Sequence, residues 1–196
     1  MIERRLRKLA RRLGFRRPHK SETAKVRHLV LDYCKGHGCD IGFGGDKIVK
    51  QDCIGIDYAQ PYTATGQDAV DIACDVIREK IPVPDNTFDY VYSSHMIEDV
   101  EDTNAVLREF IRILKPGGNL ILVFPDQSKY ERHCRRTGQP LNMCHVHADM
   151  GLTFMHQRLN ELADIRYTPL TESNCAIDYN VVMVLKIDKT EATQTA

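Results

Sequence analysis

Two aspartates and a run of glycines are the residues of this sequence best suited to binding chemistry. Asp40 stands just before the segment Gly42-Phe43-Gly44-Gly45, and Asp57 lies in a second apolar stretch over residues 53–58. Three glycines within four positions predict a turn too tight for residues that carry a Cβ atom. In an open α/β sheet, nucleotide-like ligands bind at such a turn when it follows the carboxyl end of the first strand. The segment 39–46 is therefore the predicted ligand site.

The two carboxylates separate the possible ligands. Asp57 ends its strand and is placed to accept both hydroxyls of a ribose, a feature that NAD sites and adenosyl sites share. Asp40 distinguishes an NAD site from an adenosyl site. A dinucleotide brings a pyrophosphate to the first turn, where the carboxylate would repel it. S-adenosylmethionine has an ammonium and a sulfonium there instead. Lys47 also stands where the dinucleotide fingerprint has its third glycine. The pattern favours a cationic cofactor without phosphate.

The elements that must position these residues follow from the apolar pattern. Short apolar segments that alternate with helical or loop segments predict a parallel sheet covered on both faces. Residues 127–152 are expected to be irregular, and residues 115–118 to form a turn. The pattern predicts strands over residues 39–43, 53–58, 70–76, 88–94, 119–124, 165–170 and 179–187. It predicts helices over residues 21–33, 103–114 and 155–163, with Ser21 as the first N-cap.

Six motifs, taken together, resemble the class I S-adenosylmethionine-dependent methyltransferases, and within them the type-11 group. Each motif is weak alone, but their order and spacing over about residues 40–126 make the set strong. The motifs are Asp40-Ile41-Gly42-Phe43-Gly44, Gly55-Ile56-Asp57, Cys74-Asp75-Val76, Pro82-Val83-Pro84-Asp85-Asn86-Thr87-Phe88-Asp89, Ser93-Ser94-His95-Met96-Ile97-Glu98-Asp99-Val100 and Leu114-Lys115-Pro116-Gly117-Gly118.

The resemblance implies a fold, an activity and a cofactor. The fold is a three-layer αβα Rossmann-like domain with a mostly parallel seven-stranded sheet and an antiparallel last strand. The activity is methyl transfer by in-line displacement, with S-adenosyl-L-methionine as the cofactor. The domain is expected to span residues 21–188, between a basic amphipathic segment (1–20) and a disordered tail (189–196).

The resemblance also implies roles for single residues. Asp57 would hold the ribose, and Ser94 and His95 would lie close to the transferable methyl group. In the family the third glycine of the turn falls at the position of Asp46, and Gly45 stands between, so a displaced turn is expected. The remaining roles are contact with the methionine part for Asp40, Gly42 and Gly44, and contact with the adenine for Tyr58, Asp75 and Val76.

Histidines are the candidates for proton transfer at neutral pH. His95 is placed first by its motif, and His145 and His147 follow in the passage after residue 124; for each, a structural role stays open. His133, Cys134, Cys144, His145 and His147 could be metal ligands, but their spacing fits no familiar metal pattern. The sequence therefore predicts no metal site.

Two motifs that the sequence lacks restrict the possible classes of methyl acceptor. Neither Asn/Asp-Pro-Pro-Tyr nor Pro-Cys follows residue 94, as base-amine and cytosine-C5 methylases would require. This disfavours nucleic acid and leaves a small-molecule, sugar or lipid-linked acceptor. Two other functions stay open: an NAD(P)-binding oxidoreductase on a Rossmann-like fold, and a non-catalytic S-adenosylmethionine-binding module that docks through its basic N-terminus.

Charge and cysteine content bear on location. Residues 1–20 carry nine Lys/Arg and one Glu, although the formal net charge of the 196-residue chain is zero. This segment could dock on the domain or stay mobile, contact an anionic membrane, or contact nucleic acid. The seven cysteines form no CxxC pair. Their pattern predicts a reducing, cytoplasmic location, with possible peripheral membrane contact through residues 1–20.

Overall fold

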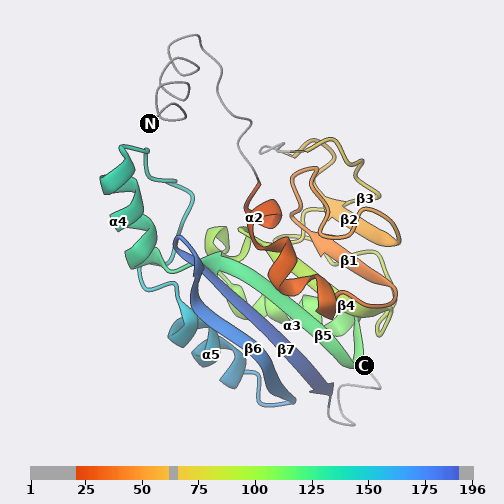
Figure 1. Ribbon diagram of the computed structural model, residues 1–196. Coiled ribbons are helices and arrows are strands. Elements are labelled where there is room, and N and C mark those ends of the chain that lie inside the picture. The colour runs from red at the N-terminus through yellow and green to blue at the C-terminus, as the bar shows by residue number, and fades with distance from the viewer. Residues whose placement is uncertain (1–20, 62–65, 190–196) are drawn as a thin grey trace.

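The computed structural model describes residues 21–61 and 66–189 (Figure 1). The basic segment 1–20 and residues 190–196 of the expected tail lie outside the described residues. The described residues thus cover most of the part of the chain that was expected to form the domain.

A seven-stranded mixed sheet forms the centre of the domain, in the strand order β3-β2-β1-β4-β5-β7-β6. Strands β1 to β5 run parallel, and β7 runs antiparallel to both β5 and β6. This confirms the predicted fold class, including the reversed last strand. The strands are β1 (Gly38–Ile41), β2 (Cys53–Asp57), β3 (Ile72–Ala73), β4 (Phe88–Ser94), β5 (Leu114–Pro125), β6 (Ile165–Ile177) and β7 (Asn180–Lys189).

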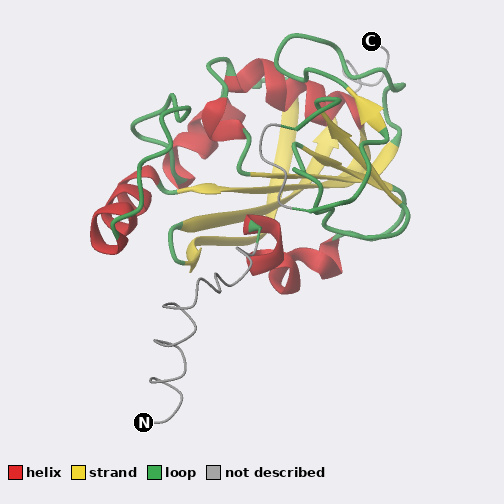
Figure 2. Cartoon of the chain, turned by 90° about the horizontal axis from the view of Figure 1, so that it is seen from above, coloured by secondary structure: helices red, strands yellow, loops and turns green. Residues whose placement is uncertain are grey.

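Helices cover the sheet from both sides, as Figure 2 shows. On one face α2 (Glu22–Val30) packs Val26 and Val30 against Tyr90 and Tyr92 of β4. On the other, α3 (Thr103–Ile113) and α5 (Leu152–Asn160) share a core with Val91 of β4. Successive side chains of a strand point to opposite faces, so β4 feeds two cores and must be buried on both.

Ser21 begins α2 as predicted. Its side-chain oxygen accepts a hydrogen bond of 2.9 Å from the backbone N–H of Ala24, which satisfies one of the donors that a helix start leaves open. Two short 3₁₀ helices, η1 (Leu31–Tyr33) and η2 (Ile97–Asp99), follow α2 and β4. The second one carries part of the motif that contains His95.

The prediction of an irregular passage after residue 126 is wrong over its first part, where helix α4 (Gln127–Thr137) forms. Only Gln127 and Cys134 of this helix are buried, so it has no apolar stripe to reveal it in the sequence. The residues that cap its two ends explain why this helix forms. The Asp126 carboxylate accepts from the backbone N–H of Lys129 at 3.0 Å, and Gly138 ends the helix in a left-handed conformation.

Three strand predictions also differ from the structure. The third strand is only two residues long, and β6 continues through residue 177. Residues 115–118, expected as a turn, lie within β5, where the pairing with β4 shifts register between Phe88 and Tyr90. An irregularity of this kind lets a strand absorb a Pro-Gly-Gly sequence without ending.

The turn after β1 is fixed by contact between two backbones. Gly45 has φ +81°, and a Cβ at this position would lie 2.7 Å from the carbonyl oxygen of Gly66. The backbone N–H of Gly66 donates to Gly44 O, and that of Asp68 donates to Gly45 O at 2.8 Å. Glycine is therefore required at position 45 both for its conformation and for space.

We expect Gly45→Ala to lower the free energy of unfolding by about 3 kcal/mol or more, measured by denaturant titration. The matched control is Gly138→Ala, which has φ +73° but no atom within 4 Å of its added Cβ. The control substitution should lower the free energy of unfolding by only about 1 kcal/mol, because it meets the left-handed conformation but no close neighbour. Equal losses in the two variants would contradict the close approach of Gly45 and Gly66.

Candidate active site

A cleft lies at the carboxyl ends of β1, β2 and β4 and consists of two adjoining pockets. Gly42, His95 and Asp99 line both pockets and so mark their boundary. The first pocket is lined further by Ile56, Asp57, Tyr58, Pro61, Cys74, Val76, Ile77 and Met96. The second is lined further by Ser21, Glu22, Thr23, Phe43, Gly44, Ser94, Glu98, Tyr130, Asn142, His145 and Tyr179.

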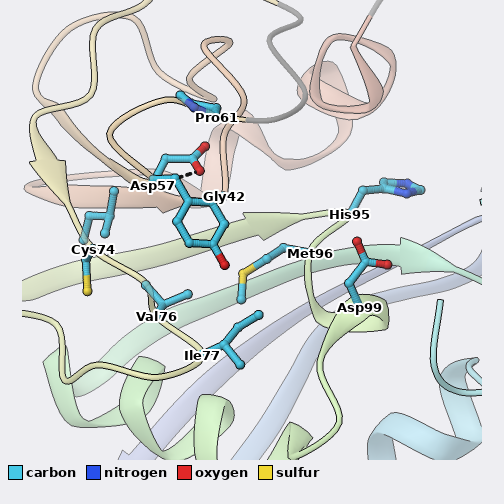
Figure 3. A pocket seen from close by; sticks show the side chains of 11 residues that line it. Gly42, Asp57, Pro61, Cys74, Val76, Ile77, His95, Met96 and Asp99 are labelled. Atoms are coloured by element: carbon cyan, nitrogen blue, oxygen red, sulfur yellow. Dashed lines mark hydrogen bonds between the residues drawn. The ribbon is translucent and has the colours of Figure 1, made fainter. Parts of the chain in front are cut away.

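The first pocket joins apolar walls to a small set of polar groups. Figure 3 shows Val76, Ile77 and Met96 on one side of it and Asp57 and Pro61 on the other. Apolar walls of this kind suit a flat heterocycle, and a carboxylate at the rim suits a pair of hydroxyls. Both features together suit an adenosine group.

Asp57 connects the strand ends to the glycine turn. One carboxylate oxygen, Oδ2, accepts from the backbone N–H of Gly44 at 2.9 Å, and Oδ1 accepts from that of Tyr58 at 2.7 Å. Burial raises the pKa of Asp57, and these two hydrogen bonds oppose the shift. Each oxygen keeps further acceptor capacity, so the carboxylate can hold the turn and still face the pocket.

Asp46, at the position where the resemblance predicts a glycine, holds the outer part of the turn. Its carboxylate accepts from Arg27 at 2.7 Å and from Lys50 at 2.6 Å, and it also accepts from the Ser21 hydroxyl. The N-terminus of α2 is thereby tied to the turn. Asp46 thus supplies a charged anchor, while Gly42, Gly44 and Gly45 take the positive φ values.

Asp40 and Asp75 lie outside the linings of both pockets. Asp40 is fully buried, and its Oδ2 accepts from the backbone N–H of Ile48 at 2.6 Å. Burial raises the pKa of Asp40 well above its usual range. Asp75 accepts from the Tyr58 hydroxyl at 3.2 Å and so stands behind that side chain. The other six predicted cofactor residues line the cleft: Gly42, Gly44, Asp57, Tyr58, Val76 and Ser94.

His95 sits at the boundary of the two pockets in a left-handed conformation, with φ +53°. Its Nδ1 lies 3.0 Å from Glu98 Oε1, and its Nε2 lies 3.0 Å from Asn180 Oδ1. Burial lowers the pKa of His95, but the Glu98 and Glu22 carboxylates and the hydrogen bonds outweigh it, so the net pKa is raised. Backbone strain of this kind tends to cluster at functional sites.

The raised pKa makes a prediction about stability. A histidine whose folded pKa exceeds the unfolded value of 6.5 stabilises the fold fully below pH 6.5 and loses that contribution as pH rises through the folded pKa. We expect the difference in free energy of unfolding between the wild type and His95→Gln to shrink as the pH rises above 6.5 and through the raised folded pKa of His95. Denaturant titrations at several pH values measure it; a difference that is constant with pH would contradict the ion pair.

His145 and His147, the other two candidates, have different surroundings. His145 lines the second pocket, where its Nδ1 lies 2.8 Å from Gln127 Oε1 and its ring packs on Tyr130. His147 points away, with Nε2 at 2.7 Å from the carbonyl oxygen of Val100. Within the described residues, no group of three His, Cys, Asp or Glu side chains is arranged to hold a metal ion.

Several pocket residues had no signal in the sequence. Tyr130, Asn142 and Tyr179 come from α4, the loop after it and the residue before β7, and only the fold brings them to the cleft. Glu98 and Asp99 lie in the motif that contains His95, but nothing in their spacing marked them. Met96, Ile77, Pro61 and Cys74 are apolar residues of ordinary type.

The residues present fit S-adenosylmethionine better than a dinucleotide. Among the described residues that line the two pockets, none is Lys or Arg, so the linings offer no cationic side chain to a pyrophosphate. The carboxylates of Glu22, Asp57, Glu98 and Asp99 make the cleft acidic instead. An acidic cleft favours a ligand that carries an ammonium and a sulfonium.

Comparison with known proteins agrees with this geometry. The model of the methyltransferase domain family matches residues 31–122. The chain is 36% identical over 116 residues to phosphoethanolamine N-methyltransferase 3 of Arabidopsis thaliana, covering 52% of this chain and 24% of that protein. It is 35% identical over 121 residues to demethylmenaquinone methyltransferase of Listeria monocytogenes, covering 55% of this chain and 51% of that protein. The chain therefore spans from about a quarter to about half of these relatives.

Solved structures share the fold at low sequence identity. An S-adenosylmethionine-dependent methyltransferase from Archaeoglobus fulgidus superposes with a TM-score of 0.57 at 16% identity, covering 84% of this chain and 92% of that chain. One from Mesorhizobium loti gives a TM-score of 0.58 at 14% identity, covering 83% and 96%. Together with the ordered motifs, these findings show that the chain is similar to S-adenosylmethionine-dependent methyltransferases over residues 31–122 and that it shares their fold.

Proposed function

We propose that this protein binds S-adenosylmethionine in the cleft and transfers its methyl group to a small polar acceptor in the second pocket. The observation that carries the proposal is the continuity of the two pockets across Gly42, His95 and Asp99. One pocket has the apolar walls and the carboxylate that suit an adenosine. The other has the ionisable and hydrogen-bonding groups that suit an acceptor.

The residues that would hold the cofactor follow from the linings. Asp57 would accept the ribose hydroxyls, and Tyr58, Val76 and Ile77 would flank the adenine. Gly42, Gly44 and Ser94 would face the methionine part, close to the N-terminus of α2. When bound, the cofactor supplies an electrophilic methyl group on a cationic sulfur. The protein then has to align the acceptor with that group and exclude water.

The acceptor is proposed from the second pocket. Tyr130, Asn142 and Tyr179 offer aromatic surface and hydrogen-bonding groups, and Glu22, Glu98 and Asp99 offer carboxylates. These groups support a polar small molecule such as a sugar, or the polar head of a lipid-linked acceptor. A phosphorylated acceptor is less well supported, because the described lining contains neither Lys nor Arg.

Transfer of a labelled methyl group from S-adenosylmethionine tests the proposal. The purified chain is incubated with pools of monosaccharides, ethanolamine, phosphoethanolamine and naphthoquinols, and the labelled product is identified by mass spectrometry. Cofactor-dependent labelling of one pool is the expected result. Cofactor binding without any labelling would favour the non-catalytic module, and NADH binding in its place would favour the oxidoreductase.

A cytoplasmic location with peripheral membrane contact stays a proposal. All seven cysteines are free thiols, which supports a reducing compartment. No helix in the described part of the chain is long and apolar enough to cross a membrane. The basic segment 1–20 supports contact with anionic lipid. Co-sedimentation of the full chain and of a chain without residues 1–20 with anionic vesicles tests the membrane contact. Equal pelleting of the two proteins would contradict it.

A further inference from the structure

The second pocket contains two histidines whose hydrogen bonds require protons at different ring nitrogens. His95 and His145 both line it. Protons can be assigned to His145 Nδ1 and to both nitrogens of His95, because the hydrogen bonds that start at these atoms end on a carboxylate, which can only accept. The sequence motifs placed His95 first as the base, and the assignments reverse that order.

Gln127 sets the tautomer of His145. This buried residue lies in the first turn of α4, and its Nε2 amide donates to Glu131 Oε1 at 3.3 Å. The opposite amide atom, Oε1, therefore faces His145 Nδ1 at 2.8 Å. An amide oxygen only accepts, so Nδ1 carries the proton. In a neutral imidazole the lone pair is then on Nε2.

His95 has no lone pair to offer. The side-chain amide of Asn180 donates to Glu22 Oε2 at 3.0 Å, so its Oδ1 accepts from His95 Nε2. On the other side of the ring, Nδ1 donates to Glu98 Oε1 at 3.0 Å. Both nitrogens carry protons, and the ring is a cation held between two carboxylates. It positions Glu98 rather than accepting a proton itself.

The surroundings of His145 suit a group that becomes charged during the reaction. Its Nε2 lies 3.9 Å from Glu98 Oε1, so the carboxylate would stabilise an imidazolium there. Glu98 is 2% exposed, and its Oε2 has no hydrogen-bond partner among the described residues. The Tyr130 ring fixes the imidazole plane at a centroid distance of 4.7 Å. The other ionisable groups of the pocket are Glu22, His95, Asp99 and Tyr179.

We propose that His145 Nε2 is the general base of the methyl transfer and that Gln127 is the residue that positions it. This inference rests on the proposed function and names an acceptor whose methylated atom carries a proton, as a hydroxyl does. The acceptor proton passes to Nε2, the acceptor's electron pair forms the bond to the methyl carbon, and the pair of the broken carbon–sulfur bond stays on sulfur. Glu98 balances the charge that His145 gains.

Nitrogen-15 NMR of histidine-labelled, full-length protein saturated with S-adenosylhomocysteine tests the assignment directly. We expect the His145 Nε2 resonance of a nitrogen with a lone pair, and protonated-type resonances from both nitrogens of His95, at neutral pH. Spectra of His145→Gln and His95→Gln assign the signals. A proton on His145 Nε2, or a lone pair on His95, would overturn the proposal.

Variants of Gln127 separate positioning from folding. Gln127→Met removes the acceptor of the Nδ1 proton and should convert His145 to a mixture of tautomers, whereas Gln127→Glu retains an acceptor and should preserve the Nε2 lone pair. An unchanged tautomer in Gln127→Met would contradict the role of Gln127. Calorimetry with S-adenosylhomocysteine is run first: no binding by the wild type refutes the proposed function, while binding with the wrong tautomer refutes only this inference.

Discussion

Asp57→Ala is expected to weaken binding of S-adenosylhomocysteine by about 30- to 100-fold, or about 2–3 kcal/mol, because a buried charged acceptor is lost. Asp57 is proposed to accept the ribose hydroxyls, and it also accepts from the backbone N–H groups of Gly44 and Tyr58. The substitution therefore removes a ligand contact and loosens the turn at once. Isothermal titration calorimetry measures the affinity.

Two further variants make the Asp57 result interpretable. Asp57→Asn keeps one acceptor oxygen and should lose less affinity than the alanine variant. Asp89→Ala removes a carboxylate that accepts from His37 and Lys115 beside the start of β4, outside both pocket linings, and should leave the affinity unchanged. If Asp57→Ala stays folded and binds as tightly as the wild type, the ribose contact is contradicted.

His145→Gln is expected to slow methyl transfer by about 100-fold or more, the contribution typical of a general base. The affinity for S-adenosylhomocysteine should stay nearly unchanged, because His145 is not among the residues proposed to contact the cofactor and lies outside the first pocket. Initial rates with the acceptor found in the labelling screen, measured beside calorimetry, separate the two effects.

The control for His145 is a histidine remote from the cleft. His156→Gln, on α5, removes an imidazole that contacts Tyr167 and Glu172 and should leave the transfer rate unchanged. Equal rates for His145→Gln and the wild type would contradict the role of His145 as base. A rate loss in His145→Gln that is matched by lost cofactor binding would show a defect of the cleft as a whole.

Local patterns predicted the elements that have strong local causes. The bounds of β4 agree residue for residue, because its residues have high strand propensity and are buried between two helical layers. Ser21 caps α2 as predicted, since the cap depends only on a contact three residues along the chain. Helix α4 was missed because its caps and charged surface, rather than an apolar stripe, define it.

The site depended more on contacts between distant residues. Asp40 precedes the turn as its motif predicts, but its carboxylate turns back to the N–H of Ile48, and no local rule gives that direction. The anchoring of Asp46 needs Arg27, which lies 19 residues away in sequence. Likewise, Tyr179 reaches the second pocket only because β7 inserts between β5 and β6.

Calorimetric titration with S-adenosylhomocysteine, beside a titration with NADH, tests the central claim most directly. The acidic cleft and the apolar walls of its first pocket predict saturable binding of S-adenosylhomocysteine by the wild type, weakened by Asp57→Ala, and no binding of NADH. Binding of NADH, or no binding of S-adenosylhomocysteine by folded protein, would contradict it.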